Sequence, residues 1–167
     1  MIRSATPADA ARLCEIYNHY VLTDVATFEE EPVLVEEMRQ RVEEVQKHFF
    51  WLVYEDAGDV IGYAYAGKWK ARAAYRYSVE LSVYLSPARQ GRGIGKQLYA
   101  ELLRRLRERD VHSVVGGVAG GNEASMALHR SFGFEKVACF RDVGHKFGRW
   151  IDVTYFQLLL PEPSSRS

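Results

Sequence analysis

Cysteine, net charge and long apolar runs are all scarce in this sequence. Its 167 residues include two cysteines, Cys14 and Cys139, which form neither a CxxC pair nor a metal-ligand spacing. The five histidines show no such spacing either, so we expect no bound metal. Both cysteines lie in apolar surroundings, and we interpret them as buried free thiols in a reducing compartment.

Charges of the two signs balance. Lysine plus arginine and aspartate plus glutamate each number 22, which gives a formal net charge of +0 and no global field to attract nucleic acid or an anionic membrane. No segment approaches the ~18 apolar residues of a membrane span, and the first four residues do not begin a signal segment. We therefore expect a soluble, cytoplasmic protein with no nucleic-acid partner and no membrane partner.

The sequence does contain enough apolar material for one core. It is 47% hydrophobic and 13% aromatic, and it is too short for two comfortable domains. We expect a single domain over residues 1–160 and a flexible tail over 161–167. Periodicity and turn residues predict strands over residues 2–5, 50–55, 60–68, 76–85, 113–118, 135–143 and 151–160. Helices are predicted from about residue 6, over 34–45, from residue 94 and over 122–132.

The resulting order, βααβββαβαββ, mixes hairpins with crossover helices. It predicts an α/β (α+β) fold in which helices flank one mixed sheet of about seven strands. The strand that ends near residue 85 would lie at the centre of this sheet.

A phosphate cradle is the most informative local feature. Residues 79–99, VELSVYLSPARQGRGIGKQLY, run an alternating strand into a glycine-punctuated loop and then into a helix that begins near Ile94. Unpaired backbone N–H groups at such a helix start can converge on one phosphate. The residues concerned are Gln90, Gly91, Arg92, Gly93, Ile94 and Gly95.

Two other phosphate loops are excluded by spacing, while an ordinary glycine-rich turn is not. A Walker loop needs glycine five residues before the Gly-Lys pair and a hydroxyl after it, but Gln90 and Gln97 hold these positions. A dinucleotide fingerprint needs its last two glycines three apart, whereas Gly91, Gly93 and Gly95 are spaced by two.

Glu80 is the candidate base. A carboxylate can act as a general base when its pKa lies near the operating pH. Glu80 sits in an alternating strand where partial desolvation would raise its pKa, and Ser82 shares its face. A carboxylate that simply faces solvent is the alternative.

Other candidates have equally plain alternatives. The Lys70 and Arg72 pair suits an oxyanionic substrate, or is only a polar loop. From the sequence alone, His129 is a packed or exposed helix residue.

The Q-x-x-G-x-G pattern after a strand resembles the acetyl-CoA pyrophosphate loop of the GNAT superfamily of N-acyltransferases. Up to about residue 160 the chain also resembles the phosphinothricin N-acetyltransferase group of that superfamily. The matching segments are Tyr17-Asn18-His19-Tyr20, Gly67 to Arg72 with Tyr75, Glu80 to Leu85, Leu98-Tyr99, His129 with Phe132-Gly133-Phe134, and Gly148 to Val153.

This resemblance implies a GNAT fold with a splayed central strand and direct transfer from acetyl-CoA in a ternary complex. The acceptor would be the α-amine of a small L-amino acid analogue such as phosphinothricin, methionine sulfoximine or methionine sulfone. The protein would be a detoxifying homodimer that confers herbicide resistance. A peptide N-terminus or another amine as acceptor, and a non-catalytic acyl-CoA sensor, are the alternatives.

The resemblance also implies site residues. Glu80 would be the general base, and His129 would transfer a proton or contact the substrate head, with Tyr99 and Tyr84 as alternative donors to the leaving thiolate. Substrate would be bound by Phe28, Lys70, Arg72, Tyr75, Ser82, Tyr99 and Val153. Acetyl-CoA would be bound by Val83, Tyr84, Leu85, Gln90, Gly91, Arg92, Gly93, Ile94, Gly95, Lys96, Asn122 and Ser125.

Overall fold

The structure is a computed structural model that describes residues 1–161. From residue 162 on, the predicted tail lies outside the described residues. Seven strands form one sheet, and they are β1 (Ile2–Ser4), β2 (Trp51–Asp56), β3 (Asp59–Lys68), β4 (Ser78–Leu85), β5 (Ser113–Ala119), β6 (Glu135–Lys146) and β7 (Arg149–Leu159). The helices are α1 (Ala10–Thr23), α2 (Val35–Gln46), α3 (Ile94–Leu106) and α4 (Glu123–Ser131). The predicted order of elements is confirmed. Among residues 1–161, no helix is both long and apolar enough to cross a membrane.

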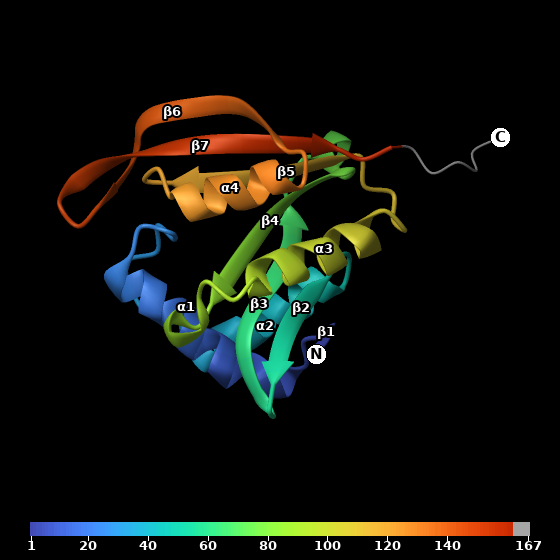
Figure 1. Ribbon diagram of the computed structural model, residues 1–167, viewed down its shortest axis with the longest axis vertical. Coiled ribbons are helices and arrows are strands. Elements are labelled where there is room, and N and C mark those ends of the chain that lie inside the picture. The colour runs from blue at the N-terminus through green and yellow to red at the C-terminus, as the bar shows by residue number, and fades with distance from the viewer. Residues whose placement is uncertain (162–167) are drawn as a thin grey trace.

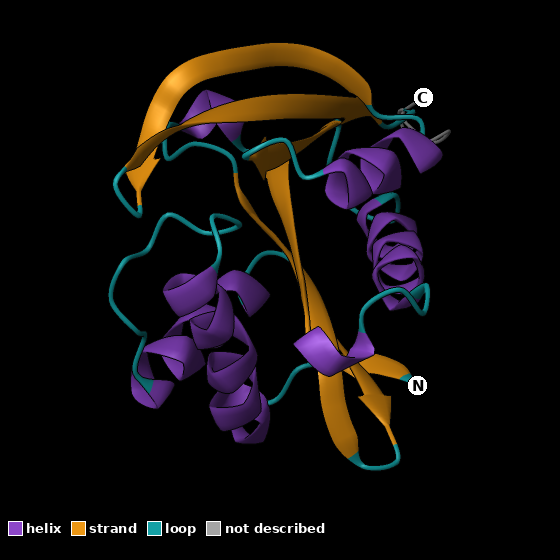
Figure 2. Cartoon of the chain, turned by 60° about the vertical axis from the view of Figure 1, so that its left-hand side comes forward, coloured by secondary structure: helices purple, strands orange, loops and turns teal. Residues whose placement is uncertain are grey.

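The strands are arranged in the order β1-β2-β3-β4-β5-β7-β6, and all neighbours are antiparallel except β4 and β5. Figures 1 and 2 show α1 and α2 on one side of the sheet and α3 on the other. The mixed sheet with flanking helices that the sequence predicts is therefore confirmed.

The central strand β4 separates from β5 halfway along its length. It pairs with β3 through Leu85, but its pairing with β5 stops at Leu81 opposite Gly116. Figure 1 shows β4 turning away from β5 beyond this point. The second half of β4, Ser82 to Leu85, therefore has one edge without a ladder partner, as predicted for a splayed strand.

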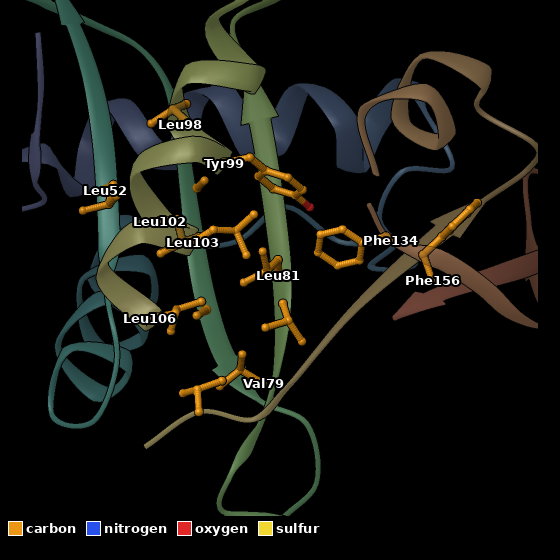
Figure 3. Close-up of a cluster of buried hydrophobic side chains, with 14 of the residues drawn as sticks. Leu52, Val79, Leu81, Leu98, Tyr99, Leu102, Leu103, Leu106, Phe134 and Phe156 are labelled. Atoms are coloured by element: carbon orange, nitrogen blue, oxygen red, sulfur yellow. The ribbon is translucent and has the colours of Figure 1, made fainter. Parts of the chain in front are cut away.

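Each face of the sheet carries its own apolar core. On one face α3 buries Leu98, Leu102 and Leu106 against strand residues such as Val79 and Leu81 (Figure 3). On the other face α1 and α2 bury side chains that include Leu13, Ile16, Met38 and Val42. Because strand side chains alternate, β4 sends Val79 and Leu81 toward α3, and Glu80 and Ser82 toward the opposite face.

Two predictions about the C-terminal hairpin are wrong. The strands predicted over 135–143 and 151–160 are longer, and only Phe147 and Gly148, both with positive φ, make the turn. Cys139 is exposed, whereas Cys14 is buried as predicted. The cause of the second error is that β6 is an edge strand, so its apolar residues do not imply burial.

Two adjacent glycines of β5 receive side chains from opposite faces. A Cβ on Gly116 would lie 2.1 Å from the His129 Nε2, and a Cβ on Gly117 would lie 3.3 Å from a Glu80 carboxylate oxygen. His129 reaches this place from α4, whose N-cap is Asn122 as predicted, with the Ser125 N–H donating to Asn122 Oδ1 at 3.0 Å. The imidazole stacks on the Phe156 ring, with 5.4 Å between the ring centres, and this packing holds it in place.

We predict that Gly116→Ala lowers the free energy of unfolding by about 1–3 kcal/mol, the usual cost of overpacking a core. Gly67→Ala in β3 is the matched control, because its new Cβ would meet nothing closer than 3.9 Å. Urea unfolding of the two variants measures the difference. Equal stabilities would contradict the tight seat of His129.

Candidate functional site

A cavity of about 770 Å³ opens where β4 and β5 separate. Its walls are the second half of β4, the end of β5, the start of α3, one side of α4 and the loop after α1. The predicted site residues that line it are Phe28, Glu80, Ser82, Val83, Tyr84, Leu85, Gln90, Gly91, Gly93, Ile94, Gly95, Lys96, Tyr99, Asn122, Ser125 and His129. Residues distant in the sequence thus meet around one cavity.

Glu80 enters this cavity from the face of the sheet that α1 and α2 cover. Its carboxylate lies over Gly117, beside the ring of Tyr155. Burial raises the pKa of Glu80 above its ordinary value of 4.5, while the positive charge of Lys70 opposes that shift. A carboxylate in this position is a stronger base than one in water.

His129 and Tyr99 enter from the opposite face. The His129 Nδ1 lies 2.7 Å from the Ser125 carbonyl, which can only accept, so Nδ1 carries the proton. Burial lowers the pKa of His129, which favours the neutral ring. Its Nε2 then accepts the Tyr99 O–H at 3.2 Å. Figure 3 shows the Tyr99 hydroxyl pointing away from α3, on the side of Phe134.

The start of α3 forms the predicted cradle. Gly93, with φ of 73°, caps the helix, and the first helical bond runs from the Gln97 N–H to the Gly93 carbonyl. The amides of Ile94, Gly95 and Lys96 precede that bond at the cavity wall, where a helix presents donors and partial positive charge. An anion at this wall would meet three N–H groups.

The glycines of the cradle differ in purpose. Gly91 and Gly93 have positive φ, and a Cβ added to either would meet only open space. Glycine is therefore favoured at these positions by the backbone conformation and not by a lack of space for a side chain. Gly95 is buried and packs near Val83 and Leu85. The Arg92 guanidinium lies outside the cavity lining, 3.9 Å from Asp56.

Four predicted substrate residues also lie outside the cavity lining. Lys70 follows β3, with its ammonium 4.9 Å from the centre of the Trp69 ring, and its charge acts on Glu80. Arg72 and Tyr75 lie at the exposed turn Ala73–Tyr75. Val153 is buried in β7, opposite Ala119 of the cavity wall. The charge of Lys70 therefore reaches Glu80, whereas Arg72 and Tyr75 lie outside the cavity lining.

Sequence reasoning missed several residues of this region. Tyr20 lines the cavity, donates to the Leu85 carbonyl at 2.6 Å and accepts from Gln90 at 3.0 Å, yet its spacing indicated only a helix core. The Gly116-Gly117 pair inside a strand was the available signal for close approach. No signal identified Lys146, which fell in the predicted turn.

No group of three or more histidine, cysteine, aspartate or glutamate side chains within residues 1–161 is arranged to hold a metal ion. The groups that converge on the cavity are instead a desolvated carboxylate, a tyrosine–histidine pair and a cluster of backbone donors.

Comparisons with known proteins agree with this arrangement. A family model for the acetyltransferase (GNAT) domain matches residues 2–155. A phosphinothricin N-acetyltransferase from Streptomyces viridochromogenes is 41% identical over 97% of this chain and 90% of its own length. An L-methionine sulfoximine/L-methionine sulfone acetyltransferase from Salmonella typhimurium is 42% identical over 96% of this chain and 95% of its own.

A solved structure extends the likeness to three dimensions. It is a phosphinothricin acetyltransferase from Sinorhizobium meliloti in complex with acetyl-CoA, with a TM-score of 0.95, 39% identity, and coverage of 100% of this chain and 91% of that one. The splayed strand, the cradle at α3 and these matches together show that the chain belongs to the GNAT family and is an N-acetyltransferase.

Proposed function

We propose that this enzyme acetylates the α-amine of a small L-amino acid analogue with an oxyanionic or tetrahedral head, such as phosphinothricin, methionine sulfoximine or methionine sulfone. The relatives named for these activities support the choice of acceptor. One observation carries the chemistry: Glu80 and the Tyr99–His129 pair reach the same cavity from opposite faces of the sheet.

The residues around the cavity fit acetyl-CoA, which when bound supplies the activated acetyl group. The amides of Ile94, Gly95 and Lys96 suit a diphosphate, because helix N-termini bind such anions. The free edge of β4 offers backbone donors and acceptors to a chain of amides such as the pantetheine arm. We assign these two surfaces to the two parts of the coenzyme.

Glu80 takes the proton of the acceptor's ammonium group. The resulting neutral amine is the nucleophile, and one proton per turnover must return from Glu80 to solvent. Lys70, whose charge acts on Glu80, would attract the acceptor's negative head, and it disfavours cationic acceptors such as polyamines by like-charge repulsion. Arg72 would add a second cation where the acceptor extends toward the turn that carries it.

Tyr99 gives a proton to the departing sulfur, and to do so its hydroxyl turns from the His129 Nε2, to which it donates in the resting site. The neutral His129 accepts at Nε2 and so is not itself the immediate donor. Burial raises the pKa of Tyr99, so a phenolate is unfavourable there and takes up the second proton of the attacking amine. Over one turnover, the second proton lost by the amine restores the proton that Tyr99 gave to the sulfur.

We extend the proposal to a cytoplasmic homodimer that detoxifies such analogues and thereby confers herbicide resistance. The support for a dimer is the apolar surface of the β6–β7 hairpin, where Phe140, Val143, Phe147 and Trp150 are all more than half exposed. The surface adjoins the side of the cavity on which Glu80 lies. The Phe140 ring packs edge-on against the Tyr155 ring, with 5.8 Å between the ring centres, and Tyr155 lies beside the Glu80 carboxylate.

Sedimentation of the protein tests the dimer. We predict a mass of about twice 19.1 kDa for the unmodified chain. Trp150→Glu should shift it toward the monomer, because a charge would be buried in the contact. A monomeric unmodified chain would contradict the proposed assembly.

A side-by-side turnover panel tests the acceptor. Thiol release should be fastest with phosphinothricin, methionine sulfoximine and methionine sulfone, and much slower with spermidine or a short peptide. A preference for the peptide would replace the proposed acceptor with a peptide N-terminus.

Glu80→Gln is the matched variant for that panel. We predict at least a 10²-fold loss of turnover with unchanged acetyl-CoA affinity, because a general base is removed and the cradle is not. In the unmodified enzyme kcat/KM should fall as pH drops through the raised pKa of Glu80, so the midpoint lies above 4.5. A variant that keeps full turnover would exclude Glu80 as the base.

Tyr99→Phe separates the two candidate tyrosines. We predict a fall in kcat of about 10²-fold, the usual contribution of a positioned proton donor. Tyr84→Phe is the control, because its hydroxyl makes only a long contact, 3.4 Å to the Ala26 carbonyl. If the Tyr84 variant were the slower of the two, the assignment of the donor would be reversed.

A further inference from the structure

Lys146 is a fully buried lysine at the end of β6, only 1% exposed. Its ammonium donates to three backbone carbonyls, those of Asp24 at 2.7 Å, Thr27 at 2.8 Å and Tyr20 at 3.4 Å. An ammonium has three donors, so all of them are used. Burying a cation is costly unless it is bonded in this way, so Lys146 is tied firmly to the segment it contacts.

The segment that Lys146 holds is the loop after α1. The Tyr20 carbonyl belongs to the last turn of α1, where the helix dipole favours a cation. Asp24 and Thr27 belong to the loop itself, which Figure 1 shows beneath the β6–β7 hairpin. Asp24, Ala26, Thr27 and Phe28 of this loop all line the cavity. A residue 119 positions away along the chain from Thr27 thus fixes one wall of the site.

Two glycines seat the side chains of the same loop. A Cβ on Gly144, two residues before Lys146, would lie 2.4 Å from the Phe28 ring. A Cβ on Gly120 would lie 2.8 Å from a methyl group of Val25. Lys146 therefore holds the backbone of the loop while Gly144 leaves space for the Phe28 ring.

The wall lies on the acceptor side of the cavity. Thr27 accepts or donates a hydrogen bond with Tyr17 at 2.7 Å, and Tyr84 reaches the Ala26 carbonyl, both on the face from which Glu80 enters. The cradle at the start of α3 lies on the other side of the splayed strand. A change in the loop should therefore affect the acceptor and not the coenzyme.

We propose that Lys146 is a positioning residue for acceptor binding: it clamps residues 24–28 so that the Phe28 ring covers the acceptor side of the cavity. The inference rests on the proposed function for its kinetic consequence. Because the clamp uses backbone carbonyls, it leaves the Phe28 side chain free to contact the acceptor. Acceptor preference can thus be changed through Phe28 without loss of the clamp.

Lys146→Met tests the clamp, since methionine has similar length and cannot donate. We expect faster amide hydrogen exchange at residues 24–28, about a 10-fold higher KM for the acceptor, and an unchanged Kd for acetyl-CoA. Lys136→Met, an exposed lysine on the same strand, is the matched control and should change none of these values. Unchanged exchange and unchanged acceptor KM in the Lys146 variant would overturn the proposal, as would an equal loss of affinity for both substrates.

Gly144→Ala is the second variant, in case Lys146→Met does not fold. Its methyl group should displace the Phe28 ring and raise the acceptor KM, and this effect should vanish in a Phe28→Ala background. Additive effects of the two substitutions would contradict the seat proposed for Phe28. The exchange measurement needs no acceptor, so it judges the clamp even if the enzyme acetylates none of the analogues in the panel.

Discussion

The interruption of hydrogen bonding between β4 and β5 is the constraint on which the site depends. A sheet normally pairs every interior backbone group, and a buried group left unpaired costs about 1–3 kcal/mol. Here the ladder stops at Leu81 and Gly116, and the groups beyond it border a cavity large enough to admit solvent or a ligand. The gap lets side chains from both faces of one sheet act at a common point, which a continuous sheet would prevent.

The proposed chemistry requires a basic carboxylate on one side of that gap and a neutral imidazole on the other, and burial shifts the pKa of each group in the needed direction. Desolvation raises the pKa of Glu80, which makes it a better base. The same physical cause lowers the pKa of His129 and keeps it neutral, so that it can accept from Tyr99. The Gly116-Gly117 pair allows both arrangements, since side chains at these positions would occupy the space of either group.

The sequence predicted the order of elements and the start of α3 at Ile94 well, because both are local. Strand alternation, the Asn122 cap and the glycine spacing at residues 91–95 each act within a few residues. The sequence did not predict features that depend on residues distant along the chain. The exposure of Cys139 follows from the position of β6 at the sheet edge, and the contacts of Lys146 join segments that periodicity cannot relate. The roles of all the site residues stay predictions, and among the described residues Arg72 and Tyr75 lie outside the cavity lining.

The account is tested most directly by following backbone amide resonances while coenzyme A is added. We predict that the largest changes occur at Ile94, Gly95 and Lys96 and along Val83 to Leu85, where the helix start and the open strand edge present free donors and acceptors. Amides of β1 and β2, which are remote from the gap, should be unaffected. Changes centred elsewhere, or none at all, would contradict the claim that the separation of β4 from β5 creates the binding site.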